Sequence, residues 1–400
     1  MNRNSLNDCT QVSQSRHVLI RPMLSVALLL LCSASFTGYA GQCRNAGPVN
    51  TANAALARTV EPVRWSRALL KRDKKWYSSS EAVRIADNLL LYQRDNGGWN
   101  KNTDMAKPLS REEEKALQAP AEKGGVATID NGATFTQMEY LARVYEATGQ
   151  QKYKEGFLRG LDYLLEAQYD NGGWPQFYPI RKGYYEHITF NDGAMMGVMQ
   201  LLRNVALNKA PYAFVDAPRK ELSANAVEKG LDVILKSQVK VNGKLTAWCA
   251  QHNHITLAPA NARAYELVSL SGGESLGIIK YLMALEKPSP EVIRAVDAAV
   301  SWTNQVKITG IRLKWIKDAT THTERDRIVV TDPTAPPLLA RFYEIGTNKP
   351  MFVGRDGIVH EKLAEIEQER RSGYSWYIAF SQELVEQDYP AWKRKWAVTE

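Results

Sequence analysis

Two short segments of the chain each place a carboxylate beside an amide and a glycine. Asp130-Asn131-Gly132 and Asn191-Asp192-Gly193 contain the same pair in inverted order. Each pair stands at the start of a predicted helix, where Asp and Asn are common caps. Capping needs only one such residue, whereas two carboxylates from neighbouring helix starts can share a hard cation. Because Ca²⁺ accepts an open shell of oxygen ligands, Asp130 and Asp192 are candidate calcium ligands.

A second polar-rich stretch runs from residue 247 to 275 and contains His252, Arg263, Tyr265 and Glu266. His252 alone would suit a core histidine bonded to the backbone, and Arg263 with Glu266 would suit a plain ion pair. The density of polar groups favours a loop that faces a substrate. We therefore take His252, Arg263 and Tyr265 as candidate substrate contacts, together with Lys101 from the long connection 94–131.

Arg355 lies between two glycines in Phe352-Val-Gly-Arg-Asp-Gly357. Little side-chain volume surrounds it, so we expect it to be exposed on a turn, either as a functional group or paired with Asp356. No Ser-His-Asp or Gly-x-Ser-x-Gly order is present, and no phosphate-cradling glycine loop. Hydrolysis by a carboxylate pair, Asp130 and Asp192, remains an alternative.

Helical periodicity dominates the elements that must hold these residues. Serines at 78–80 can cap a first helix, Gly149 can end a second, and Ser289 with Pro290 can begin another. We expect helices at about 81–93, 133–147, 152–168, 193–207, 219–238, 274–286 and 290–305, and weaker ones near 336–345 and 361–371. Strand alternation is confined to 244–248 and 328–331. The fold class is therefore mainly α.

The connections between these helices are long. Residues 94–131, 169–190, 239–272 and 306–335 exceed ordinary loop length and are rich in Trp, Tyr, His, Arg and Asp. Loops of that length in a compact domain are usually functional or disordered. Helix pairs with large loops at one end predict an α/α toroid, or helical barrel. Its long loops and few short strands would line a central cleft.

A repeat supports this architecture. Gln93-Arg-Asp-Asn-Gly-Gly-Trp99 recurs as Gln168-Tyr-Asp-Asn-Gly-Gly-Trp174, and 236–248 carries a degraded third copy. Each copy follows a helix, so Asn-Gly-Gly can supply the positive φ that ends it. Repeated helix pairs that stack side by side build a toroid. The tryptophans can pack on the turn, and Trp174 is also a candidate sugar contact.

The first residues resemble an export signal. Basic residues precede the apolar run 23–32, and small residues follow up to Ala40. The run is too short for a comfortable transmembrane anchor, and Leu31 disfavours a lipid anchor at Cys32. We therefore expect a signal peptide at 1–40, a linker or N-terminal extension at 41–70 and one large domain at 71–400.

Export leads to two further expectations. The protein would be secreted or periplasmic, would not be attached to a membrane after cleavage, and would act as a monomer. Cys43 and Cys249 would remain after cleavage, where they can pair or stay free.

The chain is moderately basic, with a formal charge of +8 that becomes +6 without residues 1–40. Such a charge suits an anionic partner. No basic tract, nucleic-acid motif or one-sided Lys/Arg helix stripe is present, which excludes nucleic acid as the expected partner. An acidic polysaccharide fits an exported protein better.

Several motifs together resemble the pectate lyases of polysaccharide lyase family 10, over about residues 75–393. The motifs are 129–134, 189–194, 248–252, 262–266, 269–275, 354–357 and 370–377. The resemblance implies an α-toroid and endo-cleavage of polygalacturonate by anti β-elimination. It also implies that Asp130 and Asp192 hold a catalytic Ca²⁺, with Asn131 beside them. Arg355 matches the catalytic base, and Arg263 matches the arginine that grips a substrate carboxylate.

The chemistry agrees with this resemblance. The proton at C5 of galacturonate lies α to a carboxylate and is weakly acidic, so a cation on that carboxylate stabilises the enolate-like transition state. Arginine is an unusual base because its pKa exceeds about 12; like-charge crowding by Ca²⁺ and Arg263 would disfavour its charge. Arg355 could instead bind substrate, with Lys101 or a water as base. Three other hypotheses for the function remain: a glycoside hydrolase, a non-catalytic carbohydrate-binding protein and a terpene-cyclase-like toroid.

Overall fold

The computed structural model describes residues 63–396, apart from the side chains of residues 121 and 122. The expected signal peptide, Cys43 and most of the expected linker lie outside the described residues. The described residues belong to one compact unit. Within it, Trp65 packs edge-on against Tyr140, with ring centroids 5.5 Å apart. The last residues of the expected linker are therefore part of the compact unit.

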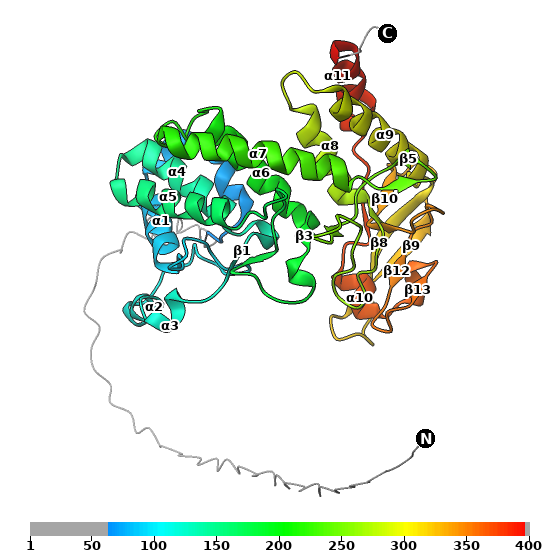
Figure 1. The fold of residues 1–400 in the computed structure, drawn as a ribbon. Coiled ribbons are helices and arrows are strands. Elements are labelled where there is room, and N and C mark those ends of the chain that lie inside the picture. Colours follow the sequence, from blue (N-terminus) through cyan, green and yellow to red (C-terminus); the bar gives the residue numbers. More distant parts are fainter. Residues whose placement is uncertain (1–62, 397–400) are drawn as a thin grey trace, which may run out of the picture. The chain divides into compact units, whose positions relative to one another are not determined.

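Long helices form most of this unit (Figure 1). They are Ser80–Tyr92 (α1), Phe135–Thr148 (α4), Gln151–Glu166 (α5), Ala194–Ala206 (α6), Ala217–Ser237 (α7), Gly272–Met283 (α8) and Pro290–Val306 (α9). Shorter helices are Arg111–Leu117 (α2), Pro120–Lys123 (α3), Gln368–Gly373 (α10) and Tyr389–Trp396 (α11). The expected caps are present: the hydroxyls of Ser79 and Ser289 accept backbone N–H bonds, and Gly149 ends α4 with a φ of 69°.

The long helices pack in two rows. The hairpins α4–α5, α6–α7 and α8–α9 each pack internally, α4, α6 and α8 follow one another in one row, and α1, α5, α7 and α9 follow one another in the other. Figure 1 shows this succession from α1 and α4 to α9. The mainly helical α/α toroid predicted from the sequence is confirmed.

The sequence repeat links successive helices of the second row. Three glutamine amides donate to carbonyls one helix further on: Gln93 to Gly156, Gln168 to Ala226 and Gln238 to Ala295, at 2.8–2.9 Å. Three indole N–H groups donate back to the preceding helix: Trp99 to Leu89, Trp174 to Leu164 and Trp248 to Ile234, at 2.7–2.8 Å. The third copy therefore keeps the contacts although its sequence has diverged.

Gly172 is required in the second copy because the turn touches the next helix. Its φ is +98°, and a Cβ there would lie 2.3 Å from the carbonyl oxygen of Lys229. We expect Gly172→Ala to lower the free energy of unfolding by at least about 3 kcal/mol. Gly149→Ala is the control, since Gly149 has a φ of +69° and open space around it. It should cost only about 1 kcal/mol. Equal losses in urea unfolding would contradict the backbone contact as the cause.

Short antiparallel strand pairs join the loops at one end of the helices. They are β1 (Ala127–Thr128) with β2 (Phe177–Tyr178), β3 (Ile188–Thr189) with β6 (Gln251–His252), β7 (Leu270–Ser271) with β11 (Phe342–Tyr343), β4 (Lys240–Val241) with β5 (Lys244–Leu245), β12 (Phe352–Val353) with β13 (Val359–His360), and β10 (Leu338–Ala340) with β14 (Tyr377–Ala379). A longer hairpin joins β8 (Ile311–Lys317) to β9 (Arg325–Thr331). The strands β1, β3 and β7 directly precede the starts of α4, α6 and α8, and each pairs with a strand from later in the chain, so the three helix starts are held in equivalent ways.

The helix predicted near 336–345 is wrong, because this segment forms β10 and β11 instead. Its apolar residues are spaced as on a helix face, but short apolar runs do not distinguish helix from strand. Pairing with β14 and β7 decides the outcome. The helix predicted near 361–371 is partly confirmed, as a 3₁₀ turn Leu363–Glu365 (η7) followed by α10.

The last helix, α11, packs on α9. The hydroxyl of Tyr389 and the ammonium of Lys393 both donate to the carboxylate of Asp297, at 2.7 and 2.9 Å. Within residues 63–396, no helix has both the length and the apolar character needed to cross a membrane.

Candidate functional site

The two Asp–Asn pairs lie in contact. Asp130–Gly132 (η4) and Asn191–Gly193 (η6) are single 3₁₀ turns directly ahead of α4 and α6, and the two turns pack against each other. Asn131 and Asp192 hold the equivalent left-handed position, with φ of 53° and 52°. Asn and Asp tolerate that conformation better than other non-glycine residues. The turns that carry Asp130 and Asp192 therefore lie against each other at the starts of α4 and α6.

Asp130 is buried, and only one of its oxygens is satisfied. Its Oδ2 accepts from Nε2 of Gln176 at 2.7 Å and pairs with the ammonium of Lys101. Its Oδ1 is buried without a hydrogen-bond partner among the described residues. A buried acceptor without a partner costs about 1–3 kcal/mol. A buried oxygen without a hydrogen-bond partner is suited to bind a cation.

Asp192 is more exposed and is held by neighbouring polar groups. Its Oδ1 accepts from Nη2 of Arg341 at 3.1 Å, and its Oδ2 accepts from Nδ2 of Asn191 at 2.8 Å. Its backbone N–H donates to Oε1 of Glu274 at 3.2 Å. Glu274 belongs to α8, the third equivalent helix, so the starts of successive helices supply Asp130, Asp192 and Glu274.

These oxygens fit calcium better than a softer metal. The part of the chain that the structure describes contains no group of three or more His, Cys, Asp or Glu that could hold a metal. A hard cation bound by Asp130 and Asp192 would complete its shell with amide, water or substrate oxygens, as Ca²⁺ readily does. Asn131 is exposed beside them, and its Nδ2 donates to Oδ1 of Asn102 at 2.9 Å.

Arg341 is a site residue that the sequence reasoning missed. Its side chain is only 12% exposed, and its Nη2 donates to Oδ1 of Asn191 at 2.9 Å as well as to Asp192. Burial opposes its charge, but the carboxylates of Glu274 and Asp192 outweigh burial and raise the pKa of Arg341 above its ordinary value. The sequence does contain a signal for Arg341, since it is a charged residue within the apolar run Leu338–Tyr343. A charged residue in such a run is expected to be buried, and a buried charge needs charged or polar partners.

Three arginines surround the ring of Tyr265. The guanidinium carbons of Arg263, Arg355 and Arg370 lie 5.1, 4.7 and 4.1 Å from the ring centroid. We call these three arginines and Tyr265 the Tyr265 cluster. Arg341 adjoins the cluster, since it lies 4.8 Å from the ring of Tyr374, which Arg370 also contacts at 4.7 Å. Contacts thus run continuously from Arg355 to Asp192.

Two members of the Tyr265 cluster have carboxylate partners. Nε of Arg263 donates to Oε2 of Glu266 at 2.9 Å, and Nε of Arg355 donates to Oε1 of Glu369 at 2.6 Å. The hydrogen bond to Glu266 raises the pKa of Arg263, and the hydrogen bond to Glu369 raises the pKa of Arg355. Both arginines are therefore cations in the free protein. Arg355 pairs with Glu369 rather than with Asp356, which was the alternative considered from the sequence.

Two candidate substrate contacts lie where no sugar can reach them. Trp174 is 0% exposed and donates its indole N–H to Leu164, so it is a turn-packing residue. His252 is also 0% exposed: its Nε2 accepts from the backbone of Cys249 at 3.1 Å and its Nδ1 lies 2.9 Å from the carbonyl of Leu257. Their assignment to substrate binding is corrected on this ground. Cys249 is buried as well, and its thiol donates to Ala260.

His252 should make stability depend on pH. Burial lowers its pKa from 6.5 to about 4, so the folded protein holds it neutral while the unfolded chain binds a proton below about 6.5. The stabilisation that results from keeping His252 neutral is fully present above pH 6.5 and is lost as the pH falls toward 4. With about 1.4 kcal/mol per pKa unit, the loss amounts to roughly 3 kcal/mol. Urea unfolding between pH 4 and 7 tests this. His252→Asn should be less stable at pH 7 and should lose less on acidification; an identical pH slope would contradict the assignment.

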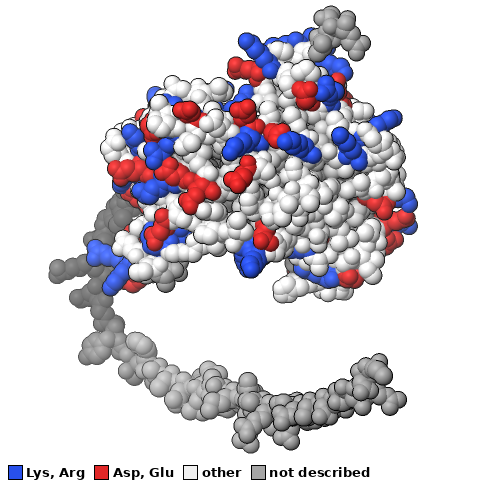
Figure 2. Space-filling view, viewed as in Figure 1, with Lys and Arg blue, Asp and Glu red and all other residues white. Residues whose placement is uncertain are grey.

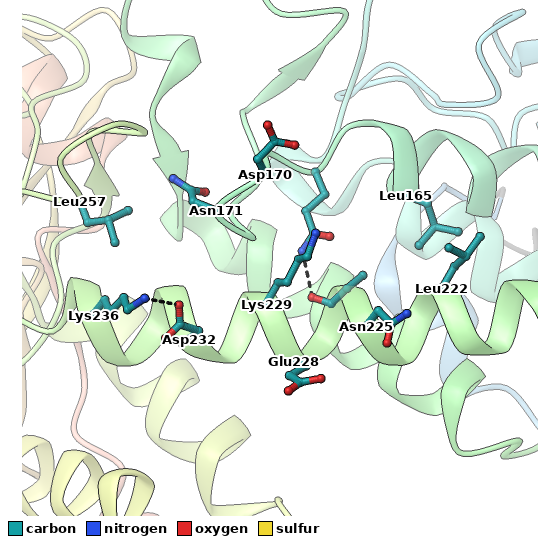
Figure 3. A pocket seen from close by; sticks show the side chains of 12 residues that line it. Leu165, Asp170, Asn171, Leu222, Asn225, Glu228, Lys229, Asp232, Lys236 and Leu257 are labelled. Carbon is teal, nitrogen blue, oxygen red and sulfur yellow. Dashed lines mark hydrogen bonds and ion pairs between the residues drawn. The ribbon is translucent and has the colours of Figure 1, made fainter.

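A cavity of about 360 Å³ adjoins the turn Asp130–Gly132, through Asn131 and Gly132. It is lined by Arg67, Lys101, Asn102, Asn131 and Thr136, among others. A larger cavity of about 860 Å³ lies along α7, where Figure 3 shows Asp170, Glu228, Lys229 and Asp232, and it contains none of the candidate site residues. Figure 2 shows acidic and basic side chains intermixed over the face it presents.

Comparison with known proteins places this geometry in a family. The model of a family described as pectic acid lyase matches residues 93–385. Two solved structures from Cellvibrio cellulosa are similar. One is an aspartate-to-alanine mutant of a family 10 polysaccharide lyase in complex with trigalacturonic acid, with 34% identity, a TM-score of 0.68 and coverage of 83% of this chain and 97% of that one. The other is a family 10 polysaccharide lyase, with 35% identity, a TM-score of 0.67 and coverage of 80% and 95%.

The comparison with curated proteins gives no match. The family match spans most of the helical unit, and both structures are covered almost completely, so the resemblance seen in the sequence motifs is confirmed. These matches favour a lyase over a glycoside hydrolase, a carbohydrate-binding protein or a terpene cyclase. The chain belongs to the pectic acid lyase family, with the fold of the family 10 polysaccharide lyases, and is a polysaccharide lyase.

Proposed function

We propose that the protein cleaves α-1,4-linked polygalacturonate by calcium-assisted anti β-elimination. The observation that carries the proposal is the contact between the turns of Asp130 and Asp192, with the unsatisfied Oδ1 of Asp130. The C5–H and C4–O bonds of one galacturonate would break as a C4–C5 double bond forms. The leaving oxygen would take up a proton.

The substrate class follows from charge and from the relatives. A solved relative holds trigalacturonic acid. In this chain Arg263, Arg341 and Arg355 are cations along the run of contacts that ends at Asp192, and Lys101 pairs with Asp130 on the adjoining turn. Arginine binds carboxylates through two parallel hydrogen bonds, so a polymer with one carboxylate per sugar suits this surface. Arg67 and Lys101 would extend that surface along the cavity beside Asn131.

Asp130 and Asp192 would hold the calcium ion, with Asn131 beside them. When bound, Ca²⁺ would withdraw charge from the substrate carboxylate and so make the C5 proton easier to remove. Lys101 and Arg341 now neutralise these carboxylates. Both side chains would be released toward substrate when a cation takes that role.

Arg355 is the proposed base, and Arg263 is the proposed carboxylate-binding residue. The partner of Arg355 is Glu369, whose side chain is 57% exposed, whereas the partner of Arg263 is Glu266, whose side chain is 9% exposed. Exposed ion pairs contribute little, so Arg355 can leave its partner more readily. Because Glu369 raises the pKa of Arg355, we expect turnover to increase toward alkaline pH.

The remaining expectations belong to the same proposal. Residues 1–40 would direct export and be removed, and the helical unit would act as a secreted or periplasmic monomer. Calcium and polygalacturonate are both available outside the cytoplasm, which agrees with an export signal.

The decisive experiment follows ultraviolet absorbance while the purified protein is incubated with polygalacturonate. We expect unsaturated product to accumulate with calcium, to stop with EDTA and to resume when Ca²⁺ is restored. New reducing ends without unsaturated product would indicate hydrolysis and overturn the proposal. If EDTA does not affect turnover, calcium has no part in the proposed mechanism.

A further inference from the structure

The segment ahead of α1 carries two arginines, Arg64 and Arg67, to the turns of the candidate calcium site. Trp65 anchors this segment, because its backbone N–H donates to Oδ1 of Asp104 at 2.8 Å. Leu69 anchors it again, since its side chain is buried in the main core. Arg67 therefore lies between two anchored residues, and Arg64 lies next to one of them.

Arg67 lies against both turns. Its Nη2 donates to the backbone carbonyl of Asp192 at 3.5 Å. A Cβ added at Gly132 would lie 3.0 Å from the same Nη2, so the guanidinium packs on the turn of Asp130 as well. The guanidinium carbon is also 5.8 Å from the centroid of the Phe135 ring, at the start of α4. The fold therefore holds the charge of Arg67 beside the turns that carry Asp130 and Asp192.

The cavity of about 360 Å³ at this place is lined by three cations, Arg64, Arg67 and Lys101. Both arginines are exposed, and neither forms an ion pair with a carboxylate in the part of the chain that the structure describes. Lys101 pairs with Asp130. Two guanidinium groups that line one cavity and hold no carboxylate are suited to bind an anion with planar oxygens.

The rest of the cavity lining is suited to a sugar. Asp104 is the one carboxylate among the described lining residues, and its Oδ1 already accepts from the backbone N–H groups of Trp65 and Ala106. Side-chain amides that can meet sugar hydroxyls come from Asn100, Asn102 and Asn131. The lining therefore combines an excess of positive charge with neutral hydrogen-bonding groups.

We propose that Arg64 and Arg67, with Lys101 beside them, form a subsite for the carboxylate of a galacturonate that neighbours the one held at the calcium site. The inference rests on the proposed function, because it takes polygalacturonate as the substrate and the turns of Asp130 and Asp192 as the calcium site. Every sugar of that polymer carries a carboxylate, and arginine binds a carboxylate through two parallel hydrogen bonds.

This subsite would make the protein selective for unesterified polymer. A methyl ester removes the charge of the sugar carboxylate and would leave both guanidinium groups without a partner. Arg64 and Arg67 also precede residues 93–385, which the family model matches. This part of the substrate surface therefore lies outside the matched region.

The test measures the binding of a galacturonate hexamer by calorimetry in calcium-free buffer, so that the ligand is not consumed. We expect Arg64→Gln/Arg67→Gln to raise the dissociation constant about tenfold, because charge-assisted hydrogen bonds to a carboxylate are lost. The fully methyl-esterified hexamer should bind the wild type and this variant with equal affinity. Arg64→Lys/Arg67→Lys should recover most of the affinity for the unesterified hexamer, since it keeps both charges.

Lys71→Gln/Arg72→Gln is the matched control. It removes two positive charges from the same segment, and both residues are exposed and do not line the cavity. Its dissociation constant should equal that of the wild type. An equal rise in this control, an unchanged dissociation constant in Arg64→Gln/Arg67→Gln, or an equal loss for the esterified hexamer would overturn the inference.

A purely structural role of Arg67 has a different signature. If Arg67 only supported the turn of Asp192, its loss would weaken the stabilisation against heat that calcium provides. We expect this stabilisation to persist in Arg64→Gln/Arg67→Gln, and its loss would overturn the subsite. Arg64→Gln alone keeps Arg67 on both turns and should still raise the dissociation constant about threefold. It provides the comparison should the double variant fail to unfold cooperatively.

Failure of the subsite and failure of the proposed function are distinguishable. Unsaturated product from the wild type, with equal hexamer affinity in the wild type and in Arg64→Gln/Arg67→Gln, would overturn the subsite alone. Hexamer binding that depends on both arginines, in a wild type that releases no unsaturated product, would overturn the lyase reaction and support the subsite.

Discussion

Replacement of Arg355 by alanine is expected to reduce kcat on polygalacturonate by at least about a thousandfold while substrate binding survives. General-base catalysis is worth about 10²–10⁴-fold, and alanine leaves no group to take the C5 proton. Binding should persist because Arg263, Arg341 and Lys101 remain to hold carboxylates. Initial rates and equilibrium binding of a galacturonate oligomer, measured on the same preparation, separate the two effects.

Arg263→Ala is the matched comparison, because Arg263 touches the same ring of Tyr265. Its loss should raise KM more than it lowers kcat, as expected for a residue that binds substrate in the ground state. The reverse pattern, with kcat lost in Arg263→Ala and KM raised in Arg355→Ala, would exchange the two roles. Near-normal kcat in Arg355→Ala would remove Arg355 from the chemistry.

Asp130→Ala is expected to raise the calcium concentration needed for half-maximal activity on the order of 100-fold, because calcium affinity depends on the charge and number of its ligands. Asp192→Ala should act in the same direction. Calcium titration of activity measures the requirement, and calcium-dependent stabilisation against heat gives a readout that does not depend on turnover.

Asp232→Ala provides the control for a lost carboxylate. Asp232 is exposed on α7, pairs with Lys236 and lines the cavity along α7 that Figure 3 shows. Its calcium titration should match the wild type. An unchanged titration in Asp130→Ala would exclude Asp130 from the calcium site.

Features that depend on local sequence patterns, such as helix positions and helix ends, could be predicted from the sequence. Helix bounds followed from apolar spacing and from caps such as Ser79 and Gly149. The repeat predicted equivalent helix starts, and the turns that carry Asp130 and Asp192 pack against each other there. The family resemblance was carried by short motifs, which the family match confirms.

Burial and distant partners could not be predicted in the same way. Polar surroundings suggested that His252 faces substrate, yet its two nitrogens are bonded inside the fold. Arg341 lies 149 residues from Asp192 in the chain, and long-range strand pairing on both sides of it, β10–β14 and β7–β11, brings it there.

The glutamine links also mark where the second row of helices ends. Each link needs a following helix to accept it, and after α9 that acceptor row is finished. The carboxylate of Asp297 is instead covered by α11, through Tyr389 and Lys393. A terminal unit of this kind seals the open end of a stacked array, as end repeats do in solenoids. The stacked array thus ends on a helix that is remote in the chain from the turns of Asp130 and Asp192.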